Sequence, residues 1–306
     1  MRELANNGWD VAVIARGEAG VNAAARDVEA AGGRGFALPA DVSDLDAVRD
    51  AAKRTEQELG PIQLWVNVAF VGALRRFWDT DIATFRRITD VTYMGQVYGT
   101  RVALELMRPR DTGVIVNVSS ALAYRGIPLQ AAYCGAKHAI KGFTESVICE
   151  LKNEGSHIKV CMLTLPGLNT PQFDWNDSGF DEHPRPVAPV FQPELAGRAV
   201  RFLADHPKRN MWVGISAAYT VLGNRVAPAF LDWYLGRTGV KGQLGDPGPR
   251  FGSNVFEPRD DHEDRGARGM FDDIAHDHDP WSAGAMRVWR VANRVLGRTR
   301  GSTGPR

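Results

Sequence analysis

Short apolar runs alternate with longer amphipathic segments over residues 10–213. The apolar runs are rich in Val and Ile and show little polar alternation, which is typical of parallel strands covered on both faces. The predicted strands are residues 11–15, 35–38, 64–68, 114–118, 159–165 and 211–213. The segments between them have helical spacing and are residues 19–31, 45–59, 82–107, 133–153 and 193–204. This alternation predicts an α/β fold with a doubly wound parallel sheet in a single domain.

The chain begins in an unusual place for such a fold. Residues 1–7 have the pattern of the last turns of a helix, which Gly8 ends before the strand that begins at Val11. In a doubly wound sheet the first strand is central, and the loop after it carries the phosphate-binding glycines. The strand at Val11 takes the place of the second strand. Because a missing central strand leaves two unpaired edges inside the core, we expect an N-terminally truncated domain whose natural start lies upstream of Met1.

The character of the sequence changes near its C-terminal end. Residues 1–236 form the predicted domain, and residues 237–284 are dense in Gly, Pro, Asp and Arg, which predicts a flexible extension. Residues 285–298 predict a short basic amphipathic helix, which either docks on its own domain through Trp289 or lies on an anionic membrane surface. The motif His276-Asp277-His278-Asp279 lacks a third placed ligand and a rigid frame, so we expect no metal site.

Composition narrows the classes of function. The chain has 306 residues, 44% of them hydrophobic, and a net charge of +1, which gives no global field for nucleic acid. Its three cysteines form an odd count without metal-ligand spacing, which suits a reducing compartment. No apolar run has the length of a membrane span, and the first residues do not form a signal peptide. We therefore expect a cytoplasmic protein.

Three residues around the fourth predicted strand carry the main chemical signal. The strand ends in Ser120, which brings this hydroxyl to the carboxyl edge of the sheet, where ligands bind in open α/β folds. Tyr133 and Lys137 are four positions apart at the start of a helix, so they share a face. A nearby ammonium favours the phenolate and lowers the pKa of a tyrosine, so we expect Tyr133 to exchange a proton that Ser120 helps to position.

This arrangement resembles the short-chain dehydrogenase/reductase family, which has a Tyr-x-x-x-Lys motif with a Ser thirteen residues before the Tyr. The resemblance implies a Rossmann-like fold, with Tyr133 as the acid/base and Lys137 also holding the nicotinamide ribose. Further positions match the family in order along the chain. They are Asp41 and Val42 at the adenine, Asn67 and Ala69 after the next strand, and Pro166, Gly167 and Thr170 at the carboxamide.

The choice of cofactor depends on Arg16, which follows the strand that selects between cofactors in this family. An acidic residue there would bind the ribose 2′-hydroxyl, whereas a guanidinium pairs with a 2′-phosphate. Arg16 therefore favours NADP(H) over NAD(H), unless it is a solvated arginine at a strand end. The resemblance also implies a homo-oligomer, since family members are often dimers or tetramers.

The sequence departs from the family at several positions. It contains no Gly-x-x-x-Gly-x-Gly loop, Val68 and Phe70 replace the usual Asn and Gly, and Thr92 stands where many members have an Asn. The sequence thus leaves two hypotheses. The first is an NADP(H)-dependent oxidoreductase that interconverts a secondary alcohol and a carbonyl on an apolar small molecule, an alcohol, ketone or aldehyde. The second is a non-catalytic binding or scaffold protein on a degraded fold.

Two apolar segments bear on the substrate. Residues 171–190 contain Phe173 and Trp175, and the resemblance makes them a lid whose aromatic side chains suit an apolar compound. Residues 217–235 form an unusually apolar stretch. They predict either a pair of core-covering helices broken at Pro228, or a pocket wall or subunit contact.

Overall fold

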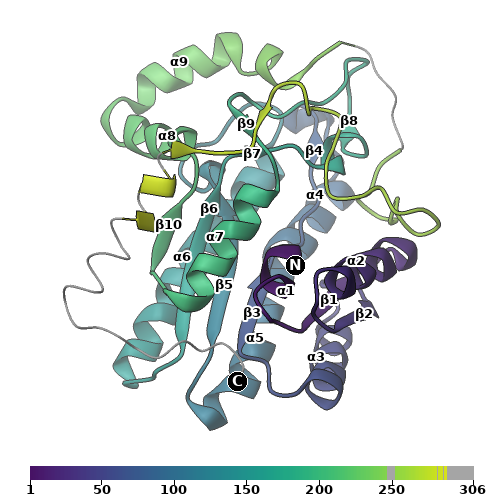
Figure 1. The fold of residues 1–306 in the computed structure, drawn as a ribbon. Coiled ribbons are helices and arrows are strands. Elements are labelled where there is room, and N and C mark those ends of the chain that lie inside the picture. Colours follow the sequence, from purple (N-terminus) through teal and green to yellow (C-terminus); the bar gives the residue numbers. More distant parts are fainter. Residues whose placement is uncertain (247–251, 281, 285, 288–306) are drawn as a thin grey trace.

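The structure is a computed structural model that describes residues 1–246, 252–280, 282–284 and 286–287. Its central sheet has four parallel strands in the order β10–β6–β5–β3 (Figure 1). Two further parallel strands, β1 and β2, form a sheet of their own. The α/β fold with parallel sheets is therefore confirmed. The bounds are β1 Val11–Ala15, β2 Gly35–Pro39, β3 Leu64–Asn67, β5 Val114–Ser120, β6 Lys159–Leu165 and β10 Asn210–Trp212.

Helices cover the sheets on both faces, and the burial of β5 shows why. Ile115 belongs to a core cluster with residues of α3, α5 and α6, whereas its neighbour Val116 belongs to a cluster with residues of α7. Successive side chains of a strand point to opposite faces, so both faces of this strand need cover. The helices are α2 Glu18–Ala30, α3 Leu45–Leu59, α4 Ile82–Thr89, α5 Gly95–Met107, α6 Ala131–Asn153 and α7 Glu194–Asp205.

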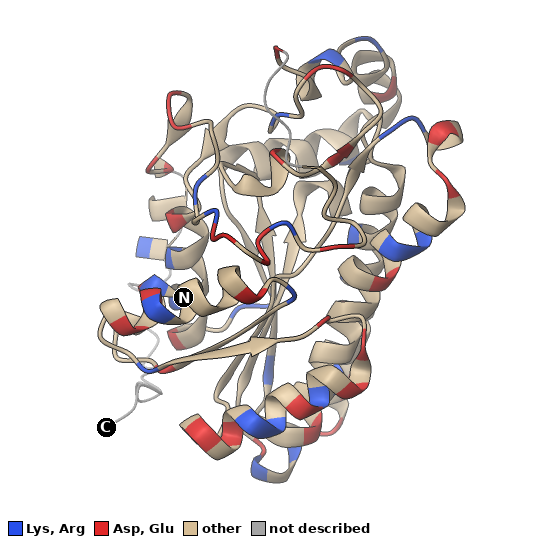
Figure 2. Cartoon of the chain, turned by 90° about the vertical axis from the view of Figure 1, so that its right-hand side faces the viewer, with Lys and Arg blue, Asp and Glu red and all other residues tan. Residues whose placement is uncertain are grey.

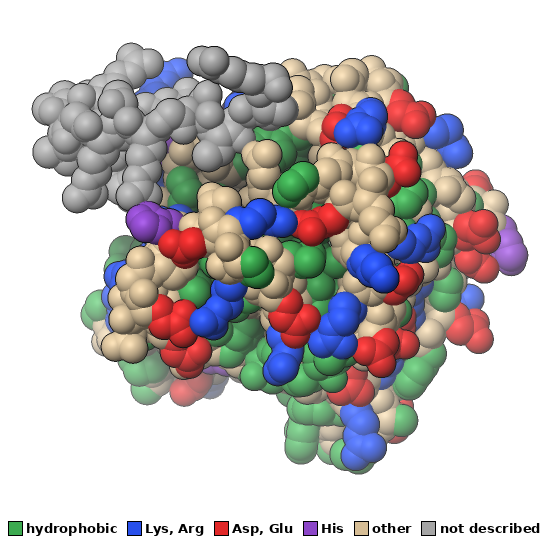
Figure 3. Space-filling view, turned by 90° about the horizontal axis from the view of Figure 1, so that it is seen from below, with side chains coloured by type: hydrophobic (Ala, Val, Ile, Leu, Met, Phe, Trp, Pro, Cys, Tyr) green, Lys and Arg blue, Asp and Glu red, His purple; other side chains and the backbone are tan. Residues whose placement is uncertain are grey.

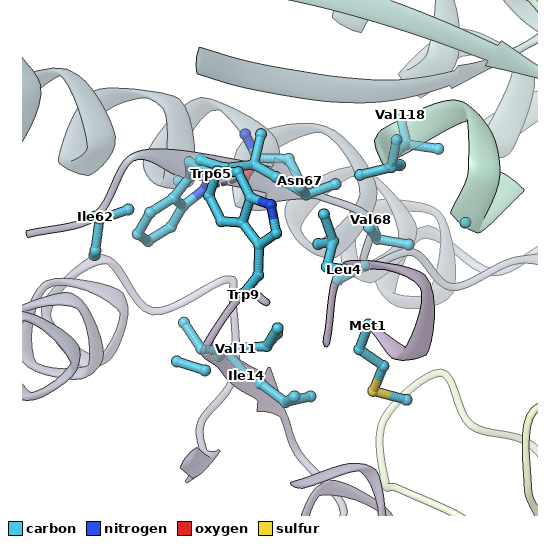
Figure 4. Close-up of a pocket in the computed structure, with 18 of the residues that line it drawn as sticks. Met1, Leu4, Trp9, Val11, Ile14, Ile62, Trp65, Asn67, Val68 and Val118 are labelled. Carbon is cyan, nitrogen blue, oxygen red and sulfur yellow. Dashed lines mark hydrogen bonds between the residues drawn. The ribbon is translucent and has the colours of Figure 1, made fainter. Parts of the chain in front are cut away.

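The two sheets are separated at the edges of β1 and β3. Among the described strands, β1 pairs with β2 alone and β3 pairs with β5 alone. A cavity of about 630 Å³ follows both open edges, and apolar side chains dominate its lining (Figure 4). The short helix α1 (Arg2–Ala5) lies at its rim, where Leu4 and Trp9 pack with Ala204 of α7. The structure thus has no continuous ladder from β2 to β10 within the described residues.

The segments after β6 form a smaller layer over the carboxyl edge of the central sheet. Strands β7 (Gly167–Leu168), β9 (Val190–Phe191) and β11 (Ala275–His276) make a three-stranded sheet. A second small sheet joins β4 (Ala73–Leu74) to β8 (Asp177–Ser178). The C-terminal extension takes part in this layer, because β11 pairs with β9 in parallel.

Helices α8 (Ile215–Val226) and α9 (Pro228–Thr238) follow the last strand of the central sheet. They are broken at Pro228, as the sequence predicts. However, α9 contains no buried residue, so it does not cover the core. Its aromatic side chains Phe230, Trp233 and Tyr234 are exposed and stack on one another.

Charged residues lie mainly on the helices and loops (Figure 2). Positive and negative side chains are interspersed on the coloured part of the face seen in Figure 3. Among the described residues, no helix is both long enough and apolar enough to cross a membrane. The basic helix predicted over residues 285–298 lies outside the described residues, apart from residues 286 and 287.

Candidate active site

The carboxyl ends of β3, β5 and β6 meet at one edge of the central sheet. Asn67 lies opposite Asn117 in the β3–β5 pair, and Ser120 lies opposite Leu165 in the β5–β6 pair. Parallel strands end at the same edge, so the sequence motifs after these strands converge here. This register brings the predicted residues Asn67, Ser120 and Pro166 to neighbouring positions.

A buried hydrogen-bond network, deeper in the protein than this edge, holds its strands and helices together. The side chain of Asn117, which is fully buried, accepts from Asn67 Nδ2 at 2.8 Å and donates to Thr144 Oγ1 at 3.0 Å. Thr100 donates to the same Asn117 oxygen at 3.1 Å, and Trp65 donates to Asn67 at 2.7 Å. Buried amides require partners, and these partners come from β3, α5 and α6. The network therefore locks the strand carrying Ser120 to the helix carrying Tyr133 and Lys137.

Ser120, Tyr133 and Lys137 lie together above this network. Ser120 is the last residue of β5, and its hydroxyl accepts from the Leu122 amide at 3.2 Å. A side-chain hydrogen bond joins it to Tyr133. Lys137 Nζ lies 5.5 Å from the centre of the Tyr133 ring and donates to the Val118 carbonyl at 2.9 Å. The structure thus places the three side chains next to one another, and their catalytic role stays a prediction.

Burial dominates the electrostatics of this group. Burial raises the pKa of Tyr133, and the hydrogen bond with Ser120 lowers it by less. Burial also lowers the pKa of Lys137 from 10.5 to about 7, because the ammonium has lost its hydration. This differs from the expectation that Lys137 lowers the pKa of the phenol. The physical reason is that both groups are taken out of water together, so each favours its neutral form.

Phe70 and Thr92 explain two of the departures from the family pattern. The Phe70 ring meets the Tyr133 ring edge-on at 5.6 Å and lies 5.7 Å from Lys137 Nζ, so it adds to the burial of both groups. Thr92 is fully buried, and its hydroxyl bonds the amide of Val71 at 3.2 Å and the carbonyl of Val71 at 3.0 Å. Thr92 thus holds the loop after β3, and it sits in a π-helical turn, Asp90–Met94, between α4 and α5.

Gln96 is a site residue that the sequence reasoning missed. It is 1% exposed, donates to the Val118 carbonyl at 2.8 Å and lines the cavity of Figure 4. Its Oε1 atom is buried and has no partner among the described residues, and an unpaired buried acceptor is costly. Its signal in the sequence is weak, because a single Gln inside an amphipathic helix is ordinary.

Arg16 and Asp41 lie at the other end of the site, next to β1 and β2. The Arg87 guanidinium bonds the Asp41 carboxylate and lowers the pKa of Asp41 against the effect of burial, with help from Ser43. Arg16 donates to the Phe256 carbonyl at 2.9 Å and also to that of Asn254. The C-terminal extension therefore contacts Arg16 directly, and it reaches Asp41 only through Arg87, whose Nε donates to the Val255 carbonyl.

The remaining predicted cofactor residues lie around the same edge. Val42 packs against the core clusters and meets Gly95, where a Cβ atom would come within 2.8 Å of it. Ala69 lines the cavity. Gly167 begins β7, and a Cβ at Gly269 of the extension would come within 2.6 Å of the Thr170 carbonyl. These residues are near the site, but the extension lies directly against Thr170.

Two groups of the site bear on the fit of a nicotinamide cofactor. An ammonium has three hydrogens, and Lys137 uses one for Val118, while Gln96 presents an unpaired buried acceptor. The remaining hydrogens of the Lys137 ammonium suit the ribose hydroxyls of a nicotinamide riboside, and the Gln96 acceptor suits its carboxamide or a hydroxyl. Among the described residues, these two groups fit the nicotinamide half of the cofactor.

A family model described as short chain dehydrogenase matches residues 1–178, more than half of the chain. The chain belongs to the short-chain dehydrogenase family. The resemblance inferred from Ser120, Tyr133 and Lys137 is thereby confirmed at the level of the family. Members of the short-chain dehydrogenase family share the fold, so the family match also accounts for the arrangement of β3, β5 and β6.

The individual relatives share about 30% or less of their residues with this chain. An uncharacterized oxidoreductase of Bacillus subtilis, YxnA, is 29% identical over 76% of this chain and 65% of its own length. A 3-ketodihydrosphingosine reductase of Bos taurus is 31% identical over 44% of this chain and 41% of its length. The crystal structure of a short-chain dehydrogenase from Streptomyces avermitilis superposes with a TM-score of 0.61 at 23% identity, covering 75% of this chain and 88% of that one. The chain thus spans less than two thirds of the two sequence relatives, and the solved structure supports the fold alone.

Proposed function

We propose that this protein is an NADP(H)-dependent oxidoreductase that interconverts a secondary alcohol and a carbonyl on an apolar small molecule. The observation that carries this proposal is the contact between Tyr133, Ser120 and the buried Lys137 at the carboxyl edge of the sheet. Family membership makes oxidoreduction of a CH–OH group the expected chemistry.

The reaction divides between cofactor and chain. A bound reduced cofactor would supply the hydride for the carbonyl carbon. Tyr133 donates its phenolic proton to the carbonyl oxygen, which completes the alcohol, and later recovers a proton from solvent. Because burial raises the pKa of Tyr133, the resting phenol is protonated and ready to act as the acid. Ser120 holds the substrate oxygen beside the phenol, and Lys137 would hold the nicotinamide ribose.

The preference for NADP(H) rests on charge. Arg16 follows β1, and Arg87 lies beside Asp41, close enough for its charge to lower the pKa of Arg16 after the larger effect of burial. Guanidinium groups form strong paired hydrogen bonds with phosphate. A cofactor with a 2′-phosphate therefore suits this end of the site better than one with a free hydroxyl.

The apolar substrate class rests on the surroundings of Tyr133. Phe70 lies edge-on against the phenol ring, so an apolar side chain borders the proposed acid. The predicted lid aromatics contribute less directly, since Phe173 packs edge-on against Phe271 of the extension at 5.8 Å. The bovine relative is named a reductase of a keto compound, which fits this class of substrate.

The test combines cofactor binding with one matched pair of variants. NADPH and NADH are titrated against the purified chain by fluorescence, followed by a screen of apolar ketones and aldehydes. We expect tighter binding of NADPH, and a Tyr133→Phe variant that loses about 100-fold to 10,000-fold in kcat while keeping its affinity for NADPH. Tyr93→Phe is the control, because Tyr93 packs against Phe143 away from Ser120. Retained turnover in Tyr133→Phe contradicts the proposal.

A non-catalytic binding protein is the second candidate. It is favoured by the extension that covers Arg16. The same experiment separates the two. NADPH binding without any turnover on the screened carbonyl compounds, in the unaltered chain, favours the binding protein.

A further inference from the structure

Residues 253–261 of the C-terminal extension form a continuous strap across the end of β1. The carbonyl groups of the strap face two cations of the domain. Arg16 donates to the carbonyls of Asn254 and Phe256, and Arg87 Nε donates to that of Val255 at 3.1 Å. The side chain of Val255 is 1% exposed. The strap is therefore built into the domain surface rather than lying loosely upon it.

The strap also occupies the N-terminus of α2. The first residues of a helix have amide groups without intrahelical partners, and Gly17 at the N-cap supplies no side chain to bond them. The strap bonds three of these amides. Glu18 donates to the Asp261 carboxylate at 3.2 Å, Ala19 to the Asp261 carbonyl at 3.2 Å, and Gly20 to the Asp260 carbonyl at 2.9 Å.

The Asp260 carboxylate is packed tightly against the backbone there. A Cβ atom added to Gly17 or Gly20 would lie 2.0 or 2.1 Å from one of its oxygens. An anion is favoured at a helix N-terminus by the helix dipole, and Asp260 and Asp261 supply that negative charge. No room is left at this point for a second anion.

We propose that residues 253–261 are an autoinhibitory strap, which competes with the phosphorylated adenosine end of a nucleotide for Arg16 and the N-terminus of α2. This inference rests on the proposed function, because that function assigns Arg16 to a 2′-phosphate. The strap carbonyls use the guanidinium hydrogens that a phosphate would need. The carboxylates of Asp260 and Asp261 repel a phosphate more strongly than they repel a free hydroxyl.

The strap is also connected to the predicted lid. The Asn254 amide donates to the Trp175 carbonyl at 3.0 Å, and Asn254 Nδ2 donates to Gln172 at 3.1 Å. Both partners lie in residues 171–190, next to the substrate side of the site. Release of the strap therefore breaks two bonds to residues 171–190, which stay attached through the pairing of β8 and β9.

The test uses the full chain and two small probes that need no nicotinamide pocket, adenosine 2′,5′-bisphosphate and adenosine 5′-monophosphate. Binding is measured by calorimetry for the unaltered chain and for Asp260→Asn/Asp261→Asn, which removes the charge and keeps the side-chain shape. We expect the variant to bind the bisphosphate about tenfold more tightly or better and the monophosphate with little change. Asp273→Asn/Asp277→Asn makes the same charge change elsewhere in the extension and should leave both affinities unaltered.

Hydrogen exchange provides the second measurement. Saturating bisphosphate should speed amide exchange across residues 253–261 of the unaltered chain, because the strap leaves its partners. Four outcomes would each overturn the proposal of an autoinhibitory strap. They are equal affinities of the unaltered chain and the variant for the bisphosphate, weaker binding of it by the variant, no binding by either protein, and an unchanged exchange rate. Weaker binding would instead make the strap a clamp on the nucleotide. The oxidoreductase proposal is judged separately, by the turnover of Tyr133→Phe.

Discussion

The Nζ atom of Lys137 donates a hydrogen bond of 2.9 Å to the carbonyl oxygen of Val118. This bond joins the first turns of α6 to the last residues of β5, the strand that ends at Ser120. The same carbonyl accepts from Gln96 of α5 at 2.8 Å. Two helices are thus tied to one backbone oxygen close to Ser120 and Tyr133, and Lys137, which makes one of these bonds, is 1% exposed.

The burial of Lys137 makes stability depend on pH. The pKa of Lys137 falls from 10.5 in the unfolded chain to about 7 in the folded protein. Between these values the unfolded chain holds a proton that the folded protein lacks, so stability rises with pH across this window. Below pH 7 the full cost remains, on the order of 4 kcal/mol.

Lys137→Met tests this dependence. Met fills the same volume without a charge, and the Val118 carbonyl keeps its bond from Gln96. We expect the variant to have a higher Tm than the unaltered chain at pH 6, with the difference shrinking toward pH 10. Thermal unfolding over this pH range, followed by circular dichroism, measures it. Lys152→Met, at the exposed end of α6, should show no such trend, and a pH-independent difference for Lys137→Met contradicts the account.

Ser120 and Ser119 form a matched pair of adjacent hydroxyl groups. Ser120 bonds Tyr133 at the edge of the sheet, whereas the Ser119 hydroxyl is buried without a partner among the described residues. Once a substrate has been found, Ser120→Ala should lower kcat about 100-fold, since a positioned donor beside the reacting oxygen is lost. Ser119→Ala should leave kcat unchanged. Steady-state kinetics decide the matter, and equal losses in both variants would assign the effect to packing of β5.

The aromatic side chains of α9 lead to a prediction about stability. Phe230 and Trp233 are 58% and 53% exposed and contact each other. We therefore expect Phe230→Ser and Trp233→Ser each to change the free energy of unfolding by less than about 0.5 kcal/mol. Phe202→Ala in α7, where the ring is 3% exposed, should cost about 3–5 kcal/mol. Urea unfolding measures all three, and a large loss in the α9 variants would mean that this face is covered in solution.

The pattern of hydrophobic residues predicted helices and strands well where the segment has one apolar face or one clear spacing of apolar residues. The strand at 11–15 and the helix at 45–59 have the predicted bounds, because a Val/Ile-rich run and a capped amphipathic run are strong signals. The helix expected over 82–107 is broken by the π-helical turn at Asp90–Met94, which no hydrophobic spacing indicates. Its cause is tertiary, since Thr92 turns inward to bond Val71.

The grouping of Ser120, Tyr133 and Lys137 was predictable for a related reason, because these residues follow local motifs on adjacent elements. The strap was not predictable. Its bonds to Arg16 use backbone carbonyls more than 230 positions away in sequence, and carbonyl groups leave no signature in the identity of residues. The exposure of α9 was equally hidden, since an apolar helix that faces solvent has the same composition as one that covers a core.

The separation of the two sheets has a consequence for how the molecule opens. A continuous sheet transmits cooperativity through its ladder, but here the ladder stops at β1 on one side and at β3 on the other. The layer of β1, α2 and β2 is attached by side-chain packing, by the loops at its ends and by residues 253–261. It can therefore come apart as a separate foldon at a lower free energy than global unfolding, while β5 and β6 stay protected. In that partly open form the amides and carbonyls along β3 would meet water first.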